Sequence, residues 1–173
     1  MRSSASRLVL LAVLVSAPLL LGVSGASAAT VHWKETARHS GAPVMGFRVD
    51  SFGFTTTGWS AKVSLKNLSS STIVIGNNFG AAIFSDHSTT DLNKVVGFAV
   101  AQTFSPARPT KLAPGASWSG TISGTGHLSA STATRYARVV FGPLRDFPGQ
   151  SGPVFWVTDH WLPLVPPPNP LTA

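Results

Sequence analysis

The alternation of apolar and polar residues is clearest between positions 59 and 68. The apolar positions are Trp59, Ala61, Val63 and Leu65, and the polar ones between them are Ser60, Lys62, Ser64 and Lys66. When apolar residues recur at every second position, alternate side chains lie on opposite faces of a β-strand. The stretch therefore predicts a strand with one buried and one hydrated face, and the buried face requires a second apolar layer opposite it.

Further segments of this kind follow along the chain, separated by clusters of Gly, Pro, Asn and Ser. The strands that we expect are 44–54, 59–68, 72–75, 79–85, 94–104, 118–123, 135–141 and 154–161. Residues 30–43 lack a clear period and are interpreted as a leader that can contribute an edge strand. Regular short strands without a helical period are typical of an antiparallel sandwich or small barrel. We expect an all-β fold, a single antiparallel immunoglobulin-like β-sandwich of about eight strands over residues 30–162.

Three features of the expected strands bear on the core. Segments 44–54 and 59–68 flank a Thr-rich turn ending at Gly58 and predict a hairpin. The run 94–104 is apolar and rich in β-branched residues, which favours a central strand. In segment 135–141 the pattern does not decide which side chains face inward. They can be Ala137, Val139 and Phe141, or the alternate set that includes Tyr136.

The N-terminal region has the organisation of a secretory signal peptide. Arg2 and Arg7 precede an apolar run over 8–21, and small residues follow up to Ala29. We expect residues 1–29 to be a signal peptide, cleaved after Ala28 or Ala29. A membrane anchor is the alternative, but the apolar run is shorter than the ~20 residues of a spanning helix. Residues 163–173 contain five prolines and predict an extended tail.

Charge and cysteine content narrow the environment further. The chain has 13 Lys and Arg against 6 Asp and Glu, and cleavage would remove two of the arginines. The mature protein therefore stays basic. The absence of cysteine excludes disulfides, thiolate metal sites and a cysteine nucleophile. Export without disulfides is more usual in bacteria, so we expect a bacterial protein that is secreted, extracellular or associated with the cell wall.

Two sequence features resemble a known type of domain. A strand led by Trp59 ends in Leu-Lys-Asn-Leu-Ser at 65–69, and a Leu-Ala-Pro-Gly turn at 112–115 leads into Trp-Ser-Gly at 118–120. Together with the closing strand 136–142, they are similar to the immunoglobulin-like domains, sometimes called telokin-like, that many bacteria export. The resemblance covers about 44–141 and implies a binding or accessory module. It supplies no catalytic residue and no ligand.

No motif for catalysis is present. The acidic residues fall in separate segments: Glu35, Asp50, Asp86, Asp91, Asp146 and Asp159. Glycoside hydrolysis usually needs two carboxyl groups at a controlled separation, which such a dispersed set supplies poorly. The nearest approach to a nucleophile elbow, GASWSG at 115–120, lacks the required spacing. We expect a protein that is not an enzyme, with a small hydrolase that uses scattered Asp and His as the alternative.

Metal and cofactor chemistry receive equally little support. The candidate ligands are Asp86, His87 and Asp91 on one loop, and Asp159 and His160 near the end of the fold. Adjacent residues on a strand point to opposite faces, so neither Asp-His pair chelates a metal by itself. We expect no metal and no cofactor.

The candidate ligand-binding residues are two tryptophans and two lysines. Trp59 and Trp118 are in phase with the apolar faces of their strands and are expected in the core, whereas Trp156 and Trp161 are candidates for an exposed pair that stacks on sugar rings or a partner. Lys62 and Lys66 share a hydrated strand face that suits an anionic surface.

These observations predict a secreted, non-enzymatic binding or accessory module at or beyond the cell surface. Its expected partners are a cell-wall polymer, a glycan or another extracellular protein. Nucleic acid is not expected, because no aromatic-basic recognition motif occurs. A structural spacer is a further alternative. The ligand, the oligomeric state and the choice between release and wall association stay open.

Overall fold

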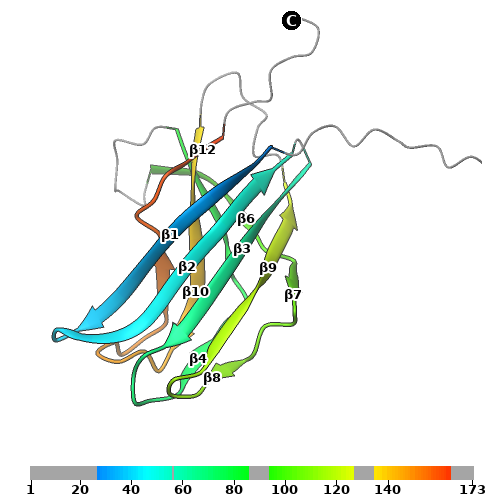
Figure 1. Cartoon of the computed structure of the whole chain (residues 1–173). Helices are drawn as coiled ribbons and strands as arrows, with labels where there is room; N and C mark the ends of the chain where they lie inside the picture. Colours follow the sequence, from blue (N-terminus) through cyan, green and yellow to red (C-terminus); the bar gives the residue numbers. More distant parts are fainter. Residues whose placement is uncertain (1–26, 56, 86–93, 127–134, 165–173) are drawn as a thin grey trace, which may run out of the picture.

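The computed structural model describes residues 27–55, 57–85, 94–126 and 135–164, and these residues form two antiparallel β-sheets that pack face to face (Figure 1). The described residues contain no α-helix, so the expected all-β sandwich is confirmed. Most of the expected signal peptide, most of the proline-rich tail and the loop with Asp86, His87 and Asp91 lie outside the described residues.

The five-stranded sheet forms the front layer in Figure 1. Its order is β1 (Ser27–His39), β2 (Ala42–Phe54), β3 (Gly58–Asn67), β9 (Ser117–Thr125) and β7 (Thr103–Ser105). The expected hairpin is confirmed, because β2 pairs with β3 in antiparallel register. The segment interpreted as a leader forms most of β1, a full edge strand of thirteen residues.

The seven-stranded sheet lies behind the first and is organised around one long strand. Its main path is β6 (Val95–Val100), β5 (Gly80–Phe84), β10 (Arg135–Arg145), β4 (Ile73–Ile75) and β8 (Lys111–Leu112). Two further strands, β11 (Val154–Val157) and β12 (Leu162–Leu164), also pair with β10. The described chain thus has more strands than the expected eight. The additional ones are β1, which lacks a clear period, β7, which was expected to continue β6, and the very short β8 and β12.

The expectation of one central strand over 94–104 was wrong. The run divides into β6, which ends the seven-stranded sheet, and β7, which ends the five-stranded sheet. Between the two strands the chain crosses from one layer to the other, and the main chain of β6 approaches β9 there. Gly124 permits the approach, since a β-carbon at this position would collide with the carbonyl oxygen of Val100.

The main core lies between the two sheets and is built on aromatic rings. The ring of Phe141 lies 5.2 Å from that of Phe47 and 5.5 Å from that of Phe79, between ring centroids. Trp59 and Trp118 are buried in the same core, as expected. Of the two alternatives for the inward face of β10, the structure has Ala137, Val139 and Phe141 facing the core.

The seven-stranded sheet also carries apolar side chains on its outer face. Ala82, Phe84 and Val140 form a second buried cluster, which Val95, Val157 and Trp161 flank. Every residue of β5 is buried as a result. The described residues include no helix of the length and apolar character that a membrane span requires.

Candidate functional site

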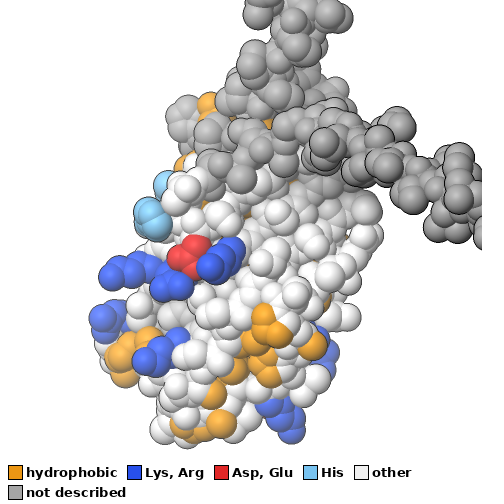
Figure 2. All heavy atoms as spheres, turned by 45° about the vertical axis from the view of Figure 1, so that its right-hand side comes forward, with side chains coloured by type: hydrophobic (Ala, Val, Ile, Leu, Met, Phe, Trp, Pro, Cys, Tyr) orange, Lys and Arg blue, Asp and Glu red, His pale blue; other side chains and the backbone are white. Residues whose placement is uncertain are grey.

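The outer face of the five-stranded sheet gathers positive side chains from three strands. We call it the cationic face, and its charged members are Lys34 on β1, Arg48 on β2, and Lys62 and Lys66 on β3. All four side chains are exposed, because each stands at an outward position of its strand. Figure 2 shows Lys and Arg side chains gathered on this side of the molecule around a single acidic one.

Strand register brings these charges close together. Lys34 stands opposite Arg48, which stands opposite Ser64, and Ser64 in turn stands opposite Ser119 on β9. Lys62 and Lys66 lie on either side of Ser64 along β3, about 13 Å apart at the usual rise of a strand. Neighbouring strands are about 4.8 Å apart, so all four charged residues originate within roughly 13 Å of one another.

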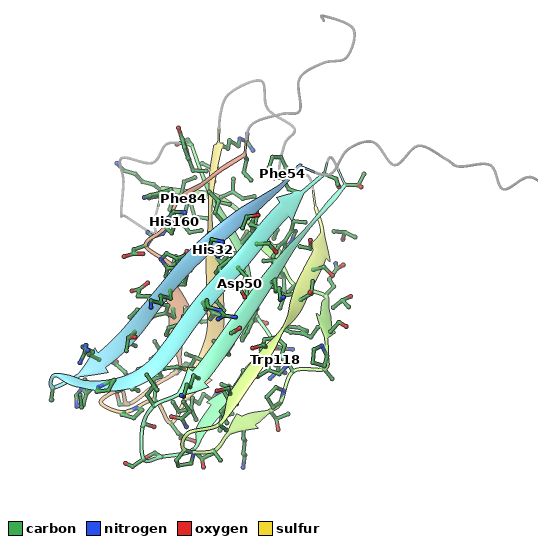
Figure 3. All side chains as sticks on the ribbon, viewed as in Figure 1. His32, Asp50, Phe54, Phe84, Trp118 and His160 are labelled. Carbon is green, nitrogen blue, oxygen red and sulfur yellow. The ribbon has the colours of Figure 1, made fainter. Side chains whose placement is uncertain are left out.

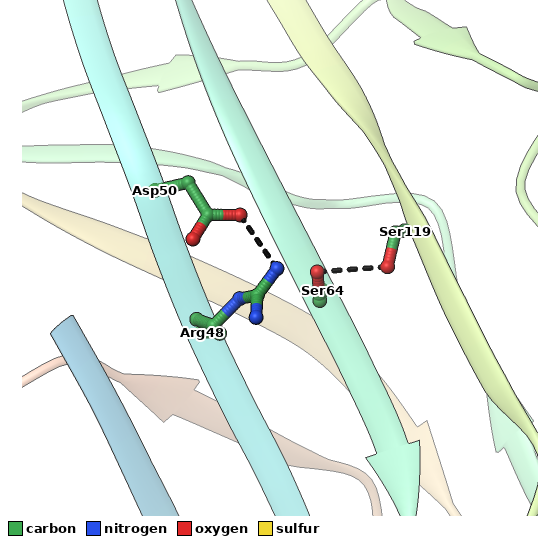
Figure 4. Close-up of polar contacts among 4 residues, drawn as sticks. All are labelled: Arg48, Asp50, Ser64 and Ser119. Atoms are coloured by element: carbon green, nitrogen blue, oxygen red, sulfur yellow. Dashed lines mark hydrogen bonds and ion pairs between the residues drawn. The ribbon is translucent and has the colours of Figure 1, made fainter. Parts of the chain in front are cut away.

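Hydroxyl groups and one carboxylate complete the face. Arg48 Nη2 contacts Asp50 Oδ2 at 2.9 Å, and the hydroxyl of Ser119 donates to that of Ser64 at 2.8 Å (Figure 4). Within the described part of the chain Lys34, Lys62 and Lys66 form no ion pair. Asp50, labelled on β2 in Figure 3, therefore offsets only part of the positive charge.

A shallow hollow of about 310 Å³ lies within the cationic face. Its lining includes Lys34, Arg48, Lys66 and the hydroxyl residues Ser64, Ser117 and Ser119. Gly46 on β2 pairs with Thr36 on β1 and with Lys66 on β3. Because glycine has no side chain, the surface of the sheet is open at this position. The arrangement presents ammonium, guanidinium and hydroxyl donors toward one exposed depression, which suits phosphate, sulfate or carboxylate groups.

The four residues singled out from the sequence do not share one surface. Lys62 and Lys66 both belong to the cationic face. Trp156 lies on β11 in the other sheet, where its ring stacks on Phe47 with centroids 5.0 Å apart and planes 5° apart. Trp161 lies against Phe84 at 4.8 Å, on the outer side of the same sheet.

Both tryptophans are only partly exposed and make intramolecular contacts. The Trp161 ring also lies 4.9 Å from the guanidinium carbon of Arg138. Arg138 is buried, and its Nε donates to the carbonyl oxygen of Thr158. Trp161 thus covers a buried cation, and Trp156 extends the aromatic core toward the edge strand β1.

Two acidic residues that are far apart in the sequence meet where β1 lies beside the segment that follows β11. The Trp33 indole donates to Asp159 Oδ1 at 2.8 Å, which ties the two segments together. Glu35, two residues along β1, faces the same seam, close enough to Asp159 to be repelled by it. The Oε2 atom of Glu35 and the indole nitrogen of Trp156 are both buried without a hydrogen bond of normal geometry.

The surroundings of Glu35 favour its protonated form. Burial raises the pKa of Glu35 above its ordinary value of 4.5, and the charge of Asp159 raises it further. Three neighbours lower the pKa of Glu35, but by less than burial and Asp159 raise it. They are the Trp156 indole, the Asp159 backbone and Arg138. Folding therefore becomes less favourable as this carboxyl group ionises.

The variant Glu35→Gln is expected to remove part of the pH dependence of stability. Because the folded pKa is raised, the favourable contribution of protonated Glu35 is complete below pH 4.5 and is lost as the pH rises through the folded pKa. The variant should therefore gain stability relative to the wild type at neutral pH and lose that advantage at pH 4.5. Urea unfolding at both pH values measures the difference. Asp146→Asn, at an exposed position, is the control, and equal pH dependence in Glu35→Gln and the wild type would contradict the assignment.

The described residues contain no group of three His, Asp or Glu side chains that could hold a metal ion. Asp159 is bonded to Trp33, and the adjacent His160 is exposed. The other candidate ligands, Asp86, His87 and Asp91, lie outside the described residues.

Sequence reasoning missed Lys34 and Arg48 as members of the cationic face. Lys34 belongs to a segment without a clear period, and the register of β2 shifts between Val49 and Ser51, which obscures the alternation there. The outward parity of Lys62 and Lys66 was the available signal, and it identified the outer face of β3. A comparison of the chain with protein-family models, curated proteins and solved structures found no match.

Proposed function

We propose that this protein is a secreted, non-enzymatic binding module of the immunoglobulin-like type exported by bacteria, and that its cationic face binds an anionic polymer at or beyond the cell surface. The N-terminal pattern of a signal peptide supports the location. The cluster of four cations on one exposed sheet face is the observation that carries the binding proposal.

The shape of the face favours a polymer over a small molecule. The charged residues spread over about 13 Å of an open sheet, and the hollow between them is shallow. Small-molecule sites are usually enclosed and mostly apolar. A chain with repeated phosphate, sulfate or carboxylate groups can contact several of these cations at once, whereas a single anion at one exposed lysine is weakly held.

Intramolecular contacts of the acidic residues support a non-enzymatic role. Asp50 is paired with Arg48, and Asp159 accepts a hydrogen bond from Trp33. Glu35 is half-buried next to the indole of Trp156, and Asp159 is exposed beside it. A nearby interior space lined by Trp33, Val49 and Thr158 is too narrow for a water molecule. In our proposal Asp159 joins the two segments through its hydrogen bond to Trp33, and Glu35 lies beside this contact without a catalytic role.

Charge reversal on β3 tests the proposal. The double variant Lys62→Glu and Lys66→Glu is expected to weaken binding to immobilised polyphosphate, dextran sulfate or alginate by at least about tenfold, or about 1.4 kcal/mol. Binding of the purified protein should also fall as salt rises, because exposed charges are screened. Uncharged dextran should not retain either protein.

A matched double variant separates a local effect from the overall charge. Lys111→Glu and Arg145→Glu change the net charge equally, but both residues are exposed on the seven-stranded sheet. This protein should bind nearly as well as the wild type. Equal losses in the two double variants, or no binding of the wild type to any of the anionic polymers at physiological salt, would reject the cationic face as the binding site.

A further inference from the structure

Strand β6 has an unusually apolar exposed surface. Val96, Phe98 and Val100 are 54%, 45% and 42% exposed, and they are three of the five large hydrophobic residues that the described chain leaves exposed. No charged residue occurs between Val95 and Phe104. This composition favours a central strand, yet β6 ends its sheet.

The backbone of β6 has an open edge as well. Ala101 N donates to Phe79 O, and the register places Ala99 opposite Ala81. Hydrogen-bonded and non-hydrogen-bonded pairs alternate in an antiparallel ladder, so the N–H and C=O groups of Phe98 point away from β5. No described strand pairs with that side of β6. The carbonyl oxygen of Val100 lies against Gly124 of β9. The part of β6 whose edge is unpaired is therefore residues 95–98.

The other ends of the two sheets carry features that prevent strand addition. On β1 these are charged residues, Lys34, Glu35 and Arg38 among them. β7 has three residues and precedes Pro106, and β8 has only two. β11 and β12, which lie along the side of β10 opposite β5, have four and three residues. Charges, prolines and short length are the usual protection of sheet edges. β6 has none of these within its six residues.

We propose that β6 pairs with the β6 strand of a second copy of this chain, so that two seven-stranded sheets join across a two-fold axis. An unprotected edge selects an extended strand as its partner. The copy supplies a strand that is also unpaired and apolar, and a two-fold interface requires self-complementary surfaces. An axis near Gly97 places Val96 of one copy opposite Phe98 of the other. The two Lys94 side chains then lie at opposite ends of the paired segment.

The pairing has a consequence for the cationic face. Antiparallel addition within a continuous sheet relates the copies by an axis perpendicular to it, so both five-stranded sheets lie on the same side. Two cationic faces then point in one direction, and one polymer chain can contact both. This consequence rests on the proposed function, whereas the dimer does not.

Sedimentation equilibrium of the purified protein tests the dimer. The wild type should show a concentration-dependent monomer and dimer, and Val96→Lys and Phe98→Lys should each be monomeric with an unchanged β-sheet dichroism spectrum. Thr121→Lys adds the same charge at an exposed position of β9 and should dimerise like the wild type. A wild type that stays monomeric at all concentrations, or a dimer that the two β6 variants leave intact, would overturn the proposal.

Cysteine cross-linking locates the contact without a disruptive charge. The chain contains no cysteine, so a single introduced thiol can bridge only to another copy. A mixture of Val96→Cys and Phe98→Cys proteins should form disulfide-linked dimers at least about tenfold faster than Thr121→Cys. Equal rates would overturn the assignment of β6, even if a dimer exists.

Discussion

Replacement of Phe141 by alanine is expected to lower the free energy of unfolding by about 3–5 kcal/mol. Phe141 is completely buried on the central strand β10. Its ring contacts Phe47 from the five-stranded sheet and Phe79, which immediately precedes β5. The truncation removes the apolar burial of the ring and leaves a cavity between the layers, because strands on both sides hold the surrounding residues in place.

Chemical unfolding followed by tryptophan fluorescence measures this loss. The control is Phe155→Ala on β11, where the side chain is 49% exposed. That change should cost no more than about 1 kcal/mol, since surface substitutions away from special features have small effects. If the two variants lost similar stability, Phe141 would not hold the sheets together as the structure indicates.

The second large effect is expected for Asn67→Ala, which should cost about 2–4 kcal/mol. Asn67 is fully buried at the end of β3. Its Nδ2 donates to the carbonyl oxygens of Ser71 at 2.7 Å and Leu112 at 2.9 Å, and its Oδ1 accepts from the N–H and hydroxyl of Ser69 at 2.9 and 2.7 Å. Alanine cannot replace these bonds, and the carbonyl oxygen of Leu112 loses a donor in a buried position.

Asn67 also joins the two segments on which the resemblance to exported domains was based. Its N–H donates to Ala116 O, and its carbonyl oxygen accepts from the N–H of Gly115. Alanine keeps these main-chain bonds, so urea unfolding of Asn67→Ala, with the exposed Asn78→Ala as control, measures the contribution of the side chain alone. A loss below about 0.5 kcal/mol in Asn67→Ala would mean that water replaces the side chain at little cost.

Stability of this kind matters for the cationic face because the face is assembled from separate strands. Lys34, Arg48 and Lys66 come from three strands whose alignment depends on the packing behind them. Phe47 and Leu65, at adjacent inward positions of β2 and β3, belong to that packing. The surface charges therefore keep their spacing only while the core holds the register.

Most of the longer strands could be predicted from the sequence. Trp59 and Val63 face the core, and Lys62 and Lys66 face solvent, because the pleat of an extended chain fixes these directions locally. The pairing of β2 with β3 followed from the short turn between them. The burial of Asn67 could not be predicted from the sequence, because its hydrogen-bond partner at Leu112 is distant along the chain.

Properties that depend on distant parts of the chain were decided by the tertiary structure. Lys34 lies beside Arg48, Asp159 reaches Trp33 across 126 positions, and β6 stands at an edge although its composition suits a centre. Period and propensity describe a residue and its near neighbours, whereas strand order depends on which distant segments bury apolar surface together. The sequence alone thus determined that the chain forms two-faced strands, and tertiary packing determined which charges, acids and edges meet.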